Sequence, residues 1–381
     1  MTEIHGTCDE RFGGVRDAFA ANFAQGLDVG ASVAVTYRGE PVVDLWGGYT
    51  DDARTRPWER DSIVNVYSTT KTMTFLCALI LADRGELDFH APVAKYWPEF
   101  AQNGKAAVEV RHLMSHSAGL SGWTEPMKPE DLYDWDKSTR LLAAQAPWWE
   151  PGTASGYHAI TQGYLVGEVV RRITGKSLGT FFKDEVATPL GADFHIGLDP
   201  REFGRVADLI PPEAVAGAFA APPDSIPMRT LGNPPLDALQ SRTKGWRMAE
   251  IPAANGHGNA RSIARIHTAL ANGGEAFGKR LLSAKGCEVV FEEQTNGMDL
   301  VLGAPLRFGM GFGLPTPGLP LGPNARTCFW GGWGGSLAQI DYDDHLVVAF
   351  AMTKMNSTTL GDARGVALRE AAYRAIGEVP A

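Results

Sequence analysis

A serine and a lysine three positions apart, Ser68 and Lys71, are the residues of this chain best suited to chemistry. They stand at the start of an apolar stretch that predicts a helix, so their side chains share one face and can touch. A serine hydroxyl attacks a carbonyl only when a base takes its proton, and a lysine acts as that base only when burial lowers its pKa from about 10.4. The apolar surroundings of Lys71 supply that burial. The N–H of Ser68, at the helix N-terminus, would point toward a developing oxyanion.

The bare S-x-x-K pattern is a weak indication, because a chain of 381 residues contains it about once by chance. A second copy is in fact present, from Ser241 to Lys244. The residues that follow it, Gly245, Trp246 and Arg247, do not continue into a buried helix. We therefore interpret this copy as accidental.

Tyr157 is a third candidate. It follows the turn Pro151-Gly152 and directly precedes a stretch with helical periodicity, which could hold its phenol over the same cleft as Ser68. Taken alone, a buried tyrosine more often completes core packing than takes part in catalysis. The segment around Tyr157 therefore does not by itself assign this residue a catalytic role.

The elements that must position these residues are sheet at both ends of the chain and helices between them. Residues 29–49 contain two β-branched, alternating runs on either side of a short polar turn, which is typical of a β-hairpin. Residues 70–83 are apolar on nearly every side and end before Gly85, which predicts a buried helix. From Cys328 onward the chain is glycine-rich, then strand-like, and closes with a predicted helix over residues 362–376.

Helical patterns dominate residues 86–280, for instance over residues 164–173. We predict an α/β domain formed by both termini, residues 1–85 and 281–381, a mostly helical domain over residues 86–280, and a cleft at their junction. Residues 211–235 hold seven prolines among apolar residues. We expect an irregular segment there that forms a wall of the pocket.

Composition and charge argue against several kinds of partner. The net charge of −9 at pH 7, without a cluster of Lys and Arg, argues against nucleic acid and against an anionic membrane surface. The most apolar run, residues 75–82, is far shorter than the ~20 residues that span a bilayer. The first residues carry acids where a signal peptide carries a basic region, so we expect a cytoplasmic protein.

No metal and no cofactor are expected. The four cysteines lie far apart without a CxxC pair, and the nine histidines include no HExxH. His112 and His116 have a spacing that suits two ligands on one helical face, but the residues around them favour a helix end. Nothing in the chain indicates an oligomeric state.

Three motifs connect the candidates in order: Ser68-x-x-Lys71, then Tyr157 after its Pro-Gly turn, then Trp330-Gly331-Gly332 ahead of Trp333. In order and spacing they resemble the superfamily of class C β-lactamases and penicillin-binding proteins, and most of all its bacterial carboxylesterases, the family VIII esterases. Further stretches that share the likeness are LMSHSAGL at 113–120, NGHGNARSIARIHTALANGG at 255–274 and RFGMGFGL at 307–314. The resemblance runs from about residue 30 to residue 375.

The resemblance implies a β-lactamase/transpeptidase-like fold, an antiparallel sheet flanked by helices with an inserted helical domain. It also implies a two-step acyl transfer in which Ser68 attacks an ester carbonyl, Lys71 and Tyr157 pass its proton to the leaving alcohol, and water releases the acid. By the same likeness, the backbone N–H groups of Ser68 and Trp333 would hold the oxyanion. The implied partner is a small-molecule ester.

Two departures from the lactamase pattern shape the expected substrate. Ala159 stands where the Y-x-N motif has its asparagine, and Trp330 stands where K-T-G has its lysine. In the family these groups hold the carboxylate and amide of β-lactams, so their replacement suggests uncharged, apolar esters and slow β-lactam hydrolysis. Besides segment 211–235, we expect the substrate to meet Trp123, Trp148, Trp149, Trp330, Gly331, Gly332 and Trp333, with His158 as an accessory polar group.

The sequence thus predicts a cofactor-free serine carboxylesterase for small to medium apolar esters, with transacylation as a variant. Two alternatives stay open: a weak β-lactamase or a D-amino acid amidase or peptidase, and a catalytically silent sensor that keeps the fold. The joint presence of Ser68, Lys71 and Tyr157 favours the enzyme.

Overall fold

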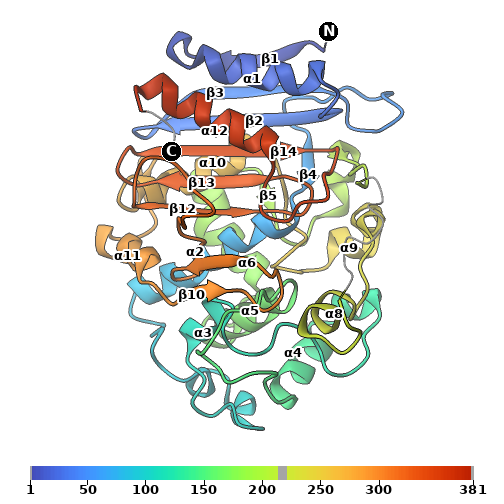
Figure 1. Ribbon diagram of the computed structural model, residues 1–381, viewed down its shortest axis with the longest axis vertical. Coiled ribbons are helices and arrows are strands. Elements are labelled where there is room, and N and C mark those ends of the chain that lie inside the picture. Colours follow the sequence, from blue (N-terminus) through green and yellow to red (C-terminus); the bar gives the residue numbers. More distant parts are fainter. Residues whose placement is uncertain (1, 213–220, 379–381) are drawn as a thin grey trace.

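The computed structural model describes residues 2–212 and 221–378. At its centre lies a six-stranded sheet in which every neighbouring pair of strands is antiparallel (Figure 1). In spatial order the strands are β1 (Ile4–Cys8), β3 (Glu40–Gly48), β2 (Gly30–Tyr37), β14 (Leu346–Met352), β13 (Leu337–Asp341) and β12 (Thr327–Gly331). Sheet therefore occurs at both ends of the chain, as the alternating patterns predict.

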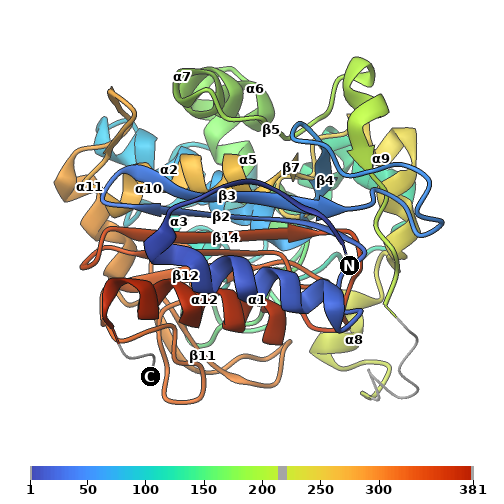
Figure 2. The same cartoon turned by 90° about the horizontal axis from the view of Figure 1, so that it is seen from above.

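Helices cover both faces of this sheet (Figure 2). α1 (Gly13–Ala24) and α12 (Ala363–Ile376) lie together on one face, and α10 (Ala260–Ala271) packs against β2 and β14 on the other. The predicted antiparallel sheet flanked by helices is confirmed. The closing helix begins one residue later than expected.

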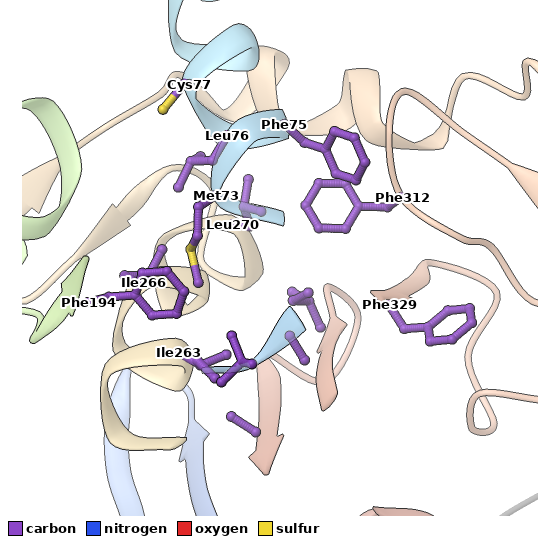
Figure 3. Close-up of a cluster of buried hydrophobic side chains, with 14 of the residues drawn as sticks. Met73, Phe75, Leu76, Cys77, Phe194, Ile263, Ile266, Leu270, Phe312 and Phe329 are labelled. Atoms are coloured by element: carbon purple, nitrogen blue, oxygen red, sulfur yellow. The ribbon is translucent and has the colours of Figure 1, made fainter. Parts of the chain in front are cut away.

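α2 (Lys71–Asp83) runs through the middle of the molecule, and eleven of its residues are buried. Figure 3 shows Met73 pointing toward Ile266 of α10, while Phe75 meets Phe312 with ring centroids 5.3 Å apart. Because apolar residues stand on every face, this helix is stable only in the interior. The predicted buried helix is confirmed, and it holds Lys71 at its first turn away from water.

Further helices pack against α2 below the sheet (Figure 1). α5 (Thr161–Thr174) contacts both α2 and α4 (Trp135–Ala144), and it ends at Gly175 with a left-handed φ of +71°. The helix expected over residues 164–173 is confirmed and begins three residues earlier. The short elements are α3 (Val110–Met114), α6 (Leu178–Phe182), α7 (Thr188–Leu190), α9 (Lys244–Met248), α11 (Ala284–Glu288), and the hairpins β8 (Glu275–Ala276) with β9 (Lys279–Arg280) and β10 (Thr295–Met298) with β11 (Pro305–Phe308).

A second, small sheet leads into α2. Its strands are, in spatial order, β5 (Phe194–His195), β7 (His257–Gly258), β4 (Ile63–Asn65) and β6 (Val206–Ala207). β4 ends three residues before Ser68, and the Val66 N–H donates to Gly256 O over 2.9 Å just beyond β4. This sheet therefore fixes the direction in which the chain enters the turn at Ser68.

The proline-rich segment differs from its prediction. Residues 213–220 lie outside the described residues, but residues 226–231 form a helix, α8 (Ile226–Leu231), where irregular structure was expected. Ser225 caps this helix by accepting the Met228 N–H, and Pro227 stands in the first turn, where its missing N–H needs no partner. A proline in that place starts a helix instead of breaking one.

In the two described ranges, none of the helices combines the length and the apolar character that crossing a membrane requires. The division into an α/β domain of residues 1–85 and 281–381 and a helical domain of residues 86–280 stays a prediction.

Candidate active site

Ser68 lies in a tight 3-10 turn, Tyr67–Thr70, between β4 and α2. Tyr67 has a φ of +42°, a left-handed conformation that destabilises a residue with a side chain. The ring of Tyr67 packs against Trp333 and Trp246, with centroids 5.1 and 6.0 Å apart, and these contacts hold the turn. As a result, Ser68 faces a cavity instead of the core.

Lys71 is completely buried, one turn after Ser68. Its Nζ lies 3.1 Å from Ser68 Oγ, 2.7 Å from the carbonyl oxygen of Ala159 and 3.0 Å from that of Ala253. No carboxylate among the described residues pairs with it, and burial lowers the pKa of Lys71 well below its usual value. A neutral amine has two N–H groups and one lone pair. The two carbonyls accept the N–H groups, which leaves the lone pair for the Ser68 hydroxyl.

Tyr157 approaches Ser68 from another side. Its hydroxyl donates to Ser68 Oγ over 2.6 Å, and its ring centroid lies 4.8 Å from Lys71 Nζ. Burial raises the pKa of Tyr157 above its usual value of 10.0, so the phenol stays protonated and acts as a donor. Ser68 Oγ accepts from Tyr157 while its own proton is available to Lys71. The structure thus brings together two oxygens that are 89 positions apart in the sequence.

Trp333 lies on a glycine-rich loop after β12 and faces the same cavity. The Gly332 N–H donates to Ser336 O over 2.8 Å, and Ser336 Oγ donates to Val66 O over 2.8 Å, which ties this loop to the turn that carries Ser68. A Cβ at Gly332 would lie 2.2 Å from Val66 O, so only glycine permits this approach. Within the described chain the Trp333 N–H has no acceptor, and it is available to an oxyanion.

The cavity beside Ser68 has a volume of about 380 Å³. α8 and the loop after it form one wall. The lining residues are Tyr67, Ser68, Tyr157, Ala159, Ile160, Met228, Thr230, Leu231, Gly232, Pro234, Leu236, Ala254, Trp333, Ser357 and Thr359. None of these described residues carries a charged side chain, so the cavity suits an uncharged, apolar group.

Trp330 does not line this cavity, in contrast to its predicted role. It is fully buried on β12, and its ring packs against Tyr157 and over His116, with centroid distances of 5.4 and 5.8 Å. Gly331 is buried too, where a Cβ would meet the backbone of Leu360 at 2.8 Å. Side chains alternate along a strand, and position 330 faces the interior. The structure therefore places Trp330, Gly331 and Gly332 behind the cavity surface.

The structure also corrects the predicted places of three tryptophans, Trp123, Trp148 and Trp149. The indole N–H groups of Trp123 and Trp149 each donate to a backbone carbonyl over 3.0 Å. Trp148 stacks on Arg229 of α8, whose guanidinium carbon lies 3.9 Å from the ring centroid. All three pack outside the cavity lining. Their apolar character predicts burial but does not say which surface they bury.

His158, predicted as an accessory polar group, lies outside the cavity lining as well. Its Nε2 accepts the Leu120 N–H over 3.1 Å, and its Nδ1 donates to Gly156 O over 2.6 Å. Burial lowers the pKa of His158 to about 3, so the ring is neutral. Both nitrogens are occupied by backbone groups, and the side chain is not available to a substrate.

The second S-x-x-K copy forms no comparable group. Ser241 Oγ donates to Ala238 O over 2.6 Å, and Lys244 is exposed at the start of α9. The structure separates the two residues, in agreement with their interpretation as an accident. In the described ranges, no three His, Cys, Asp or Glu side chains gather in a way that could hold a metal ion.

The sequence does not single out the lining residue Tyr67, which adjoins the S-x-x-K motif. It also gives no direct signal for five more distant lining residues, Ile160, Leu236, Ala254, Ser357 and Thr359. None of them belongs to a motif, and tertiary packing alone brings them to the cavity. Leu236 had an indirect signal, because it directly follows the proline-rich segment.

This chain is similar to known proteins over nearly its whole length. A family model described as Beta-lactamase matches residues 19–373. Esterase/beta-lactamase LipL of Mycobacterium tuberculosis is 38% identical over 363 residues, which span 92% of this chain and 82% of that protein. A crystal structure of a family VIII carboxylesterase is 46% identical, with a TM-score of 0.92, and covers 98% of this chain and 100% of its own. A penicillin-binding protein homologue from Caulobacter crescentus is 40% identical, with a TM-score of 0.91 and the same coverage.

Proposed function

Because the chain belongs to the β-lactamase family of serine hydrolases, we propose that it is a carboxylesterase that cleaves uncharged, apolar esters through an acyl-enzyme on Ser68. One observation carries the proposal. Ser68 Oγ lies 2.6 Å from the Tyr157 hydroxyl and 3.1 Å from Lys71 Nζ, at the edge of an apolar cavity. A hydroxyl, a desolvated amine and a phenol at these distances suit acyl transfer.

In the acylation step, Ser68 Oγ attacks the ester carbonyl while its proton moves to the Lys71 amine. The oxyanion accepts hydrogen bonds from the N–H groups of Ser68 and Trp333. When the C–O bond to the alcohol breaks, Lys71 and Tyr157 pass the proton to the departing oxygen. The products are an acyl-enzyme and a free alcohol.

In the deacylation step, water takes the place of the alcohol. Lys71 and Tyr157 accept one of its protons as the oxygen attacks the acyl carbon, and this proton returns to Ser68 Oγ when the acyl bond breaks. The carboxylic acid leaves, and the enzyme regains its starting protonation. An alcohol that replaced water would yield transacylation with the same groups.

The lining of the cavity favours esters over β-lactams. A substrate carboxylate finds no cationic side chain among the described lining residues, and an unpaired buried charge is strongly unfavourable. Ala159 contributes only its carbonyl oxygen, which Lys71 occupies at 2.7 Å. Small to medium apolar acyl groups therefore match the site best.

A labelling experiment tests this function, with the second S-x-x-K serine as a matched control. Wild type and Ser241→Ala should each gain the mass of one phosphonyl group after a fluorophosphonate, whereas Ser68→Ala should gain none. Wild type and Ser241→Ala should also turn over p-nitrophenyl butyrate, whereas Ser68→Ala should not. Labelling that persists in Ser68→Ala, or that disappears in Ser241→Ala, would contradict the assignment.

β-Lactam hydrolysis is the second candidate activity, because a protein named as an esterase and β-lactamase is similar over 92% of this chain. Turnover of a butyrate ester, a cephalosporin and a D-alanyl amide separates the alternatives, and the ester should react fastest. An acyl-enzyme that forms but never releases its acid would instead indicate a silent, sensor-like protein.

A cytoplasmic location is part of this proposal. Fractionation of the native host tests it, because the protein should follow cytoplasmic markers.

A further inference from the structure

Tyr157 is held at three successive backbone positions. The N–H groups of Gly156 and His158 donate to the carbonyl oxygen and to Nδ1 of His116, over 2.9 and 3.1 Å. Between them, the Tyr157 N–H donates to Asp299 Oδ1 over 3.1 Å. We propose that His116 and Asp299 are positioning residues that hold the Tyr157 phenol on the nucleophile. The inference rests on the proposed function, in which this phenol helps to move the serine proton.

His116 holds the ring of Tyr157 as well as its backbone. The edge of one ring meets the other at a centroid distance of 5.1 Å and an angle of 64°. Trp330 completes the packing, because its ring stacks on His116 at 5.8 Å and touches Tyr157 at 5.4 Å. The place of the phenol oxygen thus depends on the backbone and ring contacts of one histidine.

The hydrogen bonds also define the protonation of His116. Because Nδ1 accepts the His158 N–H, the ring proton must sit on Nε2. Burial lowers the pKa of His116 well below its usual value, so the ring stays neutral and Nδ1 stays an acceptor. An imidazolium could not accept this bond, and the backbone after Tyr157 would lose its partner.

Both residues carry features that lower stability. His116 has a φ of +59°, and its Nε2 is buried without a hydrogen-bond partner among the described residues. Asp299 Oδ2 is buried and unpartnered within the same ranges. Strained and unsatisfied groups persist mainly where function uses them. Because other buried groups, such as Asp28 Oδ2 and His267 Nε2, are unpartnered too, the positioning role rests on the hydrogen bonds to the backbone around Tyr157.

Asp299 connects Tyr157 to a turn far along the chain. Its Oδ1 also accepts the N–H groups of Val301 and Leu302, over 2.9 Å each. A single oxygen that collects three backbone N–H groups defines the geometry of the turn and of the tyrosine together. The Leu300 N–H in the same turn donates to Ser155 O, two residues before Tyr157, over 2.8 Å, and this adds a second connection.

The hydroxyl of Tyr157 needs this support because it lies 2.6 Å from Ser68 Oγ. Misplacement of a reacting group by about 1 Å lowers a rate about 10²-fold. Loss of either positioning residue should therefore lower kcat. The cavity lining contains neither His116 nor Asp299, so KM should change little.

The test compares variants that keep or remove one acceptor. His116→Asn keeps an oxygen near the place of Nδ1 and tolerates the left-handed backbone, whereas His116→Gln carries its amide too far. Asp299→Asn keeps Oδ1, whereas Asp299→Ala removes it. With p-nitrophenyl butyrate, the Gln and Ala variants should lose about 10- to 100-fold in kcat at nearly constant KM. Asp299→Asn should recover most of this loss, and His116→Asn, which restores the acceptor but not the ring contacts, should recover part of it.

Asp341→Ala is the matched control. Asp341 is as buried as Asp299, and its Oδ1 accepts the N–H groups of Asp343 and Asp344 in the following turn. Its Oδ2 accepts from Tyr373 of α12, on the other side of the sheet from α10. This variant should keep the kcat of the wild type, which shows that loss of a buried turn-capping carboxylate alone does not lower activity.

The same substitutions in a Tyr157→Phe background separate positioning from a general structural role. If His116 and Asp299 act through the phenol, its removal leaves them nothing to position, and further losses should stay within about twofold. Phosphonylation of Ser68 by a fluorophosphonate, followed for hours by whole-protein mass spectrometry, measures the slow rates in this background.

Losses that multiply fully in the Tyr157→Phe background would overturn the proposal. So would equal activity of His116→Gln and His116→Asn, or a change confined to KM. If Asp299→Ala does not fold, the two His116 variants decide alone. A wild type that turns over no ester would refute the proposed function first, before any variant is compared.

Discussion

The two sides of the cavity are built in opposite ways. One side is a polar corner, Ser68, Lys71 and Tyr157. The Tyr157 hydroxyl and Lys71 Nζ lie 2.6 and 3.1 Å from Ser68 Oγ, and Tyr157 is 89 positions away from Ser68 in the sequence. The other is an apolar wall, residues 226–236, formed by α8 and the loop that follows it. Proton transfer needs fixed distances, whereas an acyl chain needs only an apolar surface of suitable shape. Rate should therefore depend on the corner and substrate preference on the wall.

The apolar wall is also attached to the rest of the molecule separately from the polar corner. Asn233 accepts the Met127 N–H over 2.7 Å and donates to the carbonyl oxygens of Trp123 and Glu125 over 2.8 Å. These bonds connect the wall to one loop and involve none of the residues of the polar corner. Ile226 and Leu231 pack in the side-chain cluster of Tyr157, but a wall residue outside that cluster, such as Leu236, can change without disturbing the proton-transfer distances.

The largest effect should come from Lys71→Arg in the polar corner. An arginine keeps the positive charge but cannot release its proton, so it cannot act as a base. We expect kcat for p-nitrophenyl butyrate to fall by about 10³-fold or more. Lys95→Arg, at an exposed position, is the control and should match the wild type. A Lys71→Arg variant that keeps more than a tenth of the wild-type kcat would contradict the role of Lys71 as the base.

Tyr157→Phe should have the next largest effect, a loss of about 10²-fold in kcat, because the ring is kept and only the proton-carrying oxygen is removed. The matched control is Tyr164→Phe. Tyr164 is also fully buried, but its hydroxyl donates to the Leu132 carbonyl oxygen. Steady-state kinetics of both variants test the role of the phenol. Equal losses in the two would assign the effect to packing.

A wall substitution should change preference instead of rate. Leu236→Ala enlarges the cavity at a lining leucine that does not pack in the cluster of Tyr157, so the ratio of kcat/KM for a hexanoate ester to that for a butyrate ester should rise about tenfold. The kcat for an acetate ester should stay within about threefold, because the polar corner is untouched. Leu239→Ala, at an exposed leucine, should leave the ratio unchanged. If acetate turnover falls as much as it does in Tyr157→Phe, the wall and the polar corner do not act independently.

The smallest effect on rate should follow from Asn233→Ala. This change leaves three backbone groups without their partner, and we expect the free energy of unfolding to drop by about 1 to 3 kcal/mol. The kcat for an acetate ester should be nearly constant, since the wall and not the corner is loosened. Chemical denaturation and steady-state kinetics on the same preparation measure both. A loss of kcat without a loss of stability would show that the attachment of the wall affects the catalytic rate set by the polar corner.

The polar corner was predictable to the extent that local geometry creates it. Ser68 and Lys71 are three positions apart, on a 3-10 turn that leads directly into α2, so local helical geometry brings them together. Tyr157 was reached only through the resemblance to a known family, because the packing of α5 against α2 cannot be deduced from its own segment. The strands at both ends of the chain were predictable from their apolar, β-branched runs, whereas the antiparallel sheet as a whole was implied by the family resemblance.

Other features depend on contacts that leave no pattern in the sequence. Trp148 and Trp149 have the apolar character of pocket residues, yet that character does not specify the surface they bury. His116 and Asp299 act on backbone N–H groups far along the chain, which requires no particular spacing. The helix α8 did have a local signal, because Ser225 two residues before Pro227 is a typical helix start.

The central claim is that a neutral Lys71 takes the proton of Ser68. The pH dependence of Ser68 phosphonylation by a fluorophosphonate tests it most directly, with Ser68→Ala as the blank. A base works only when deprotonated, so the rate rises with pH up to the pKa of Lys71 and then levels off. Because burial lowers this pKa well below its ordinary value of 10.5, the plateau should begin well below pH 10.5. A rate that still climbs about tenfold per pH unit as the pH approaches 10.5 would mean an ordinary lysine and would contradict the account.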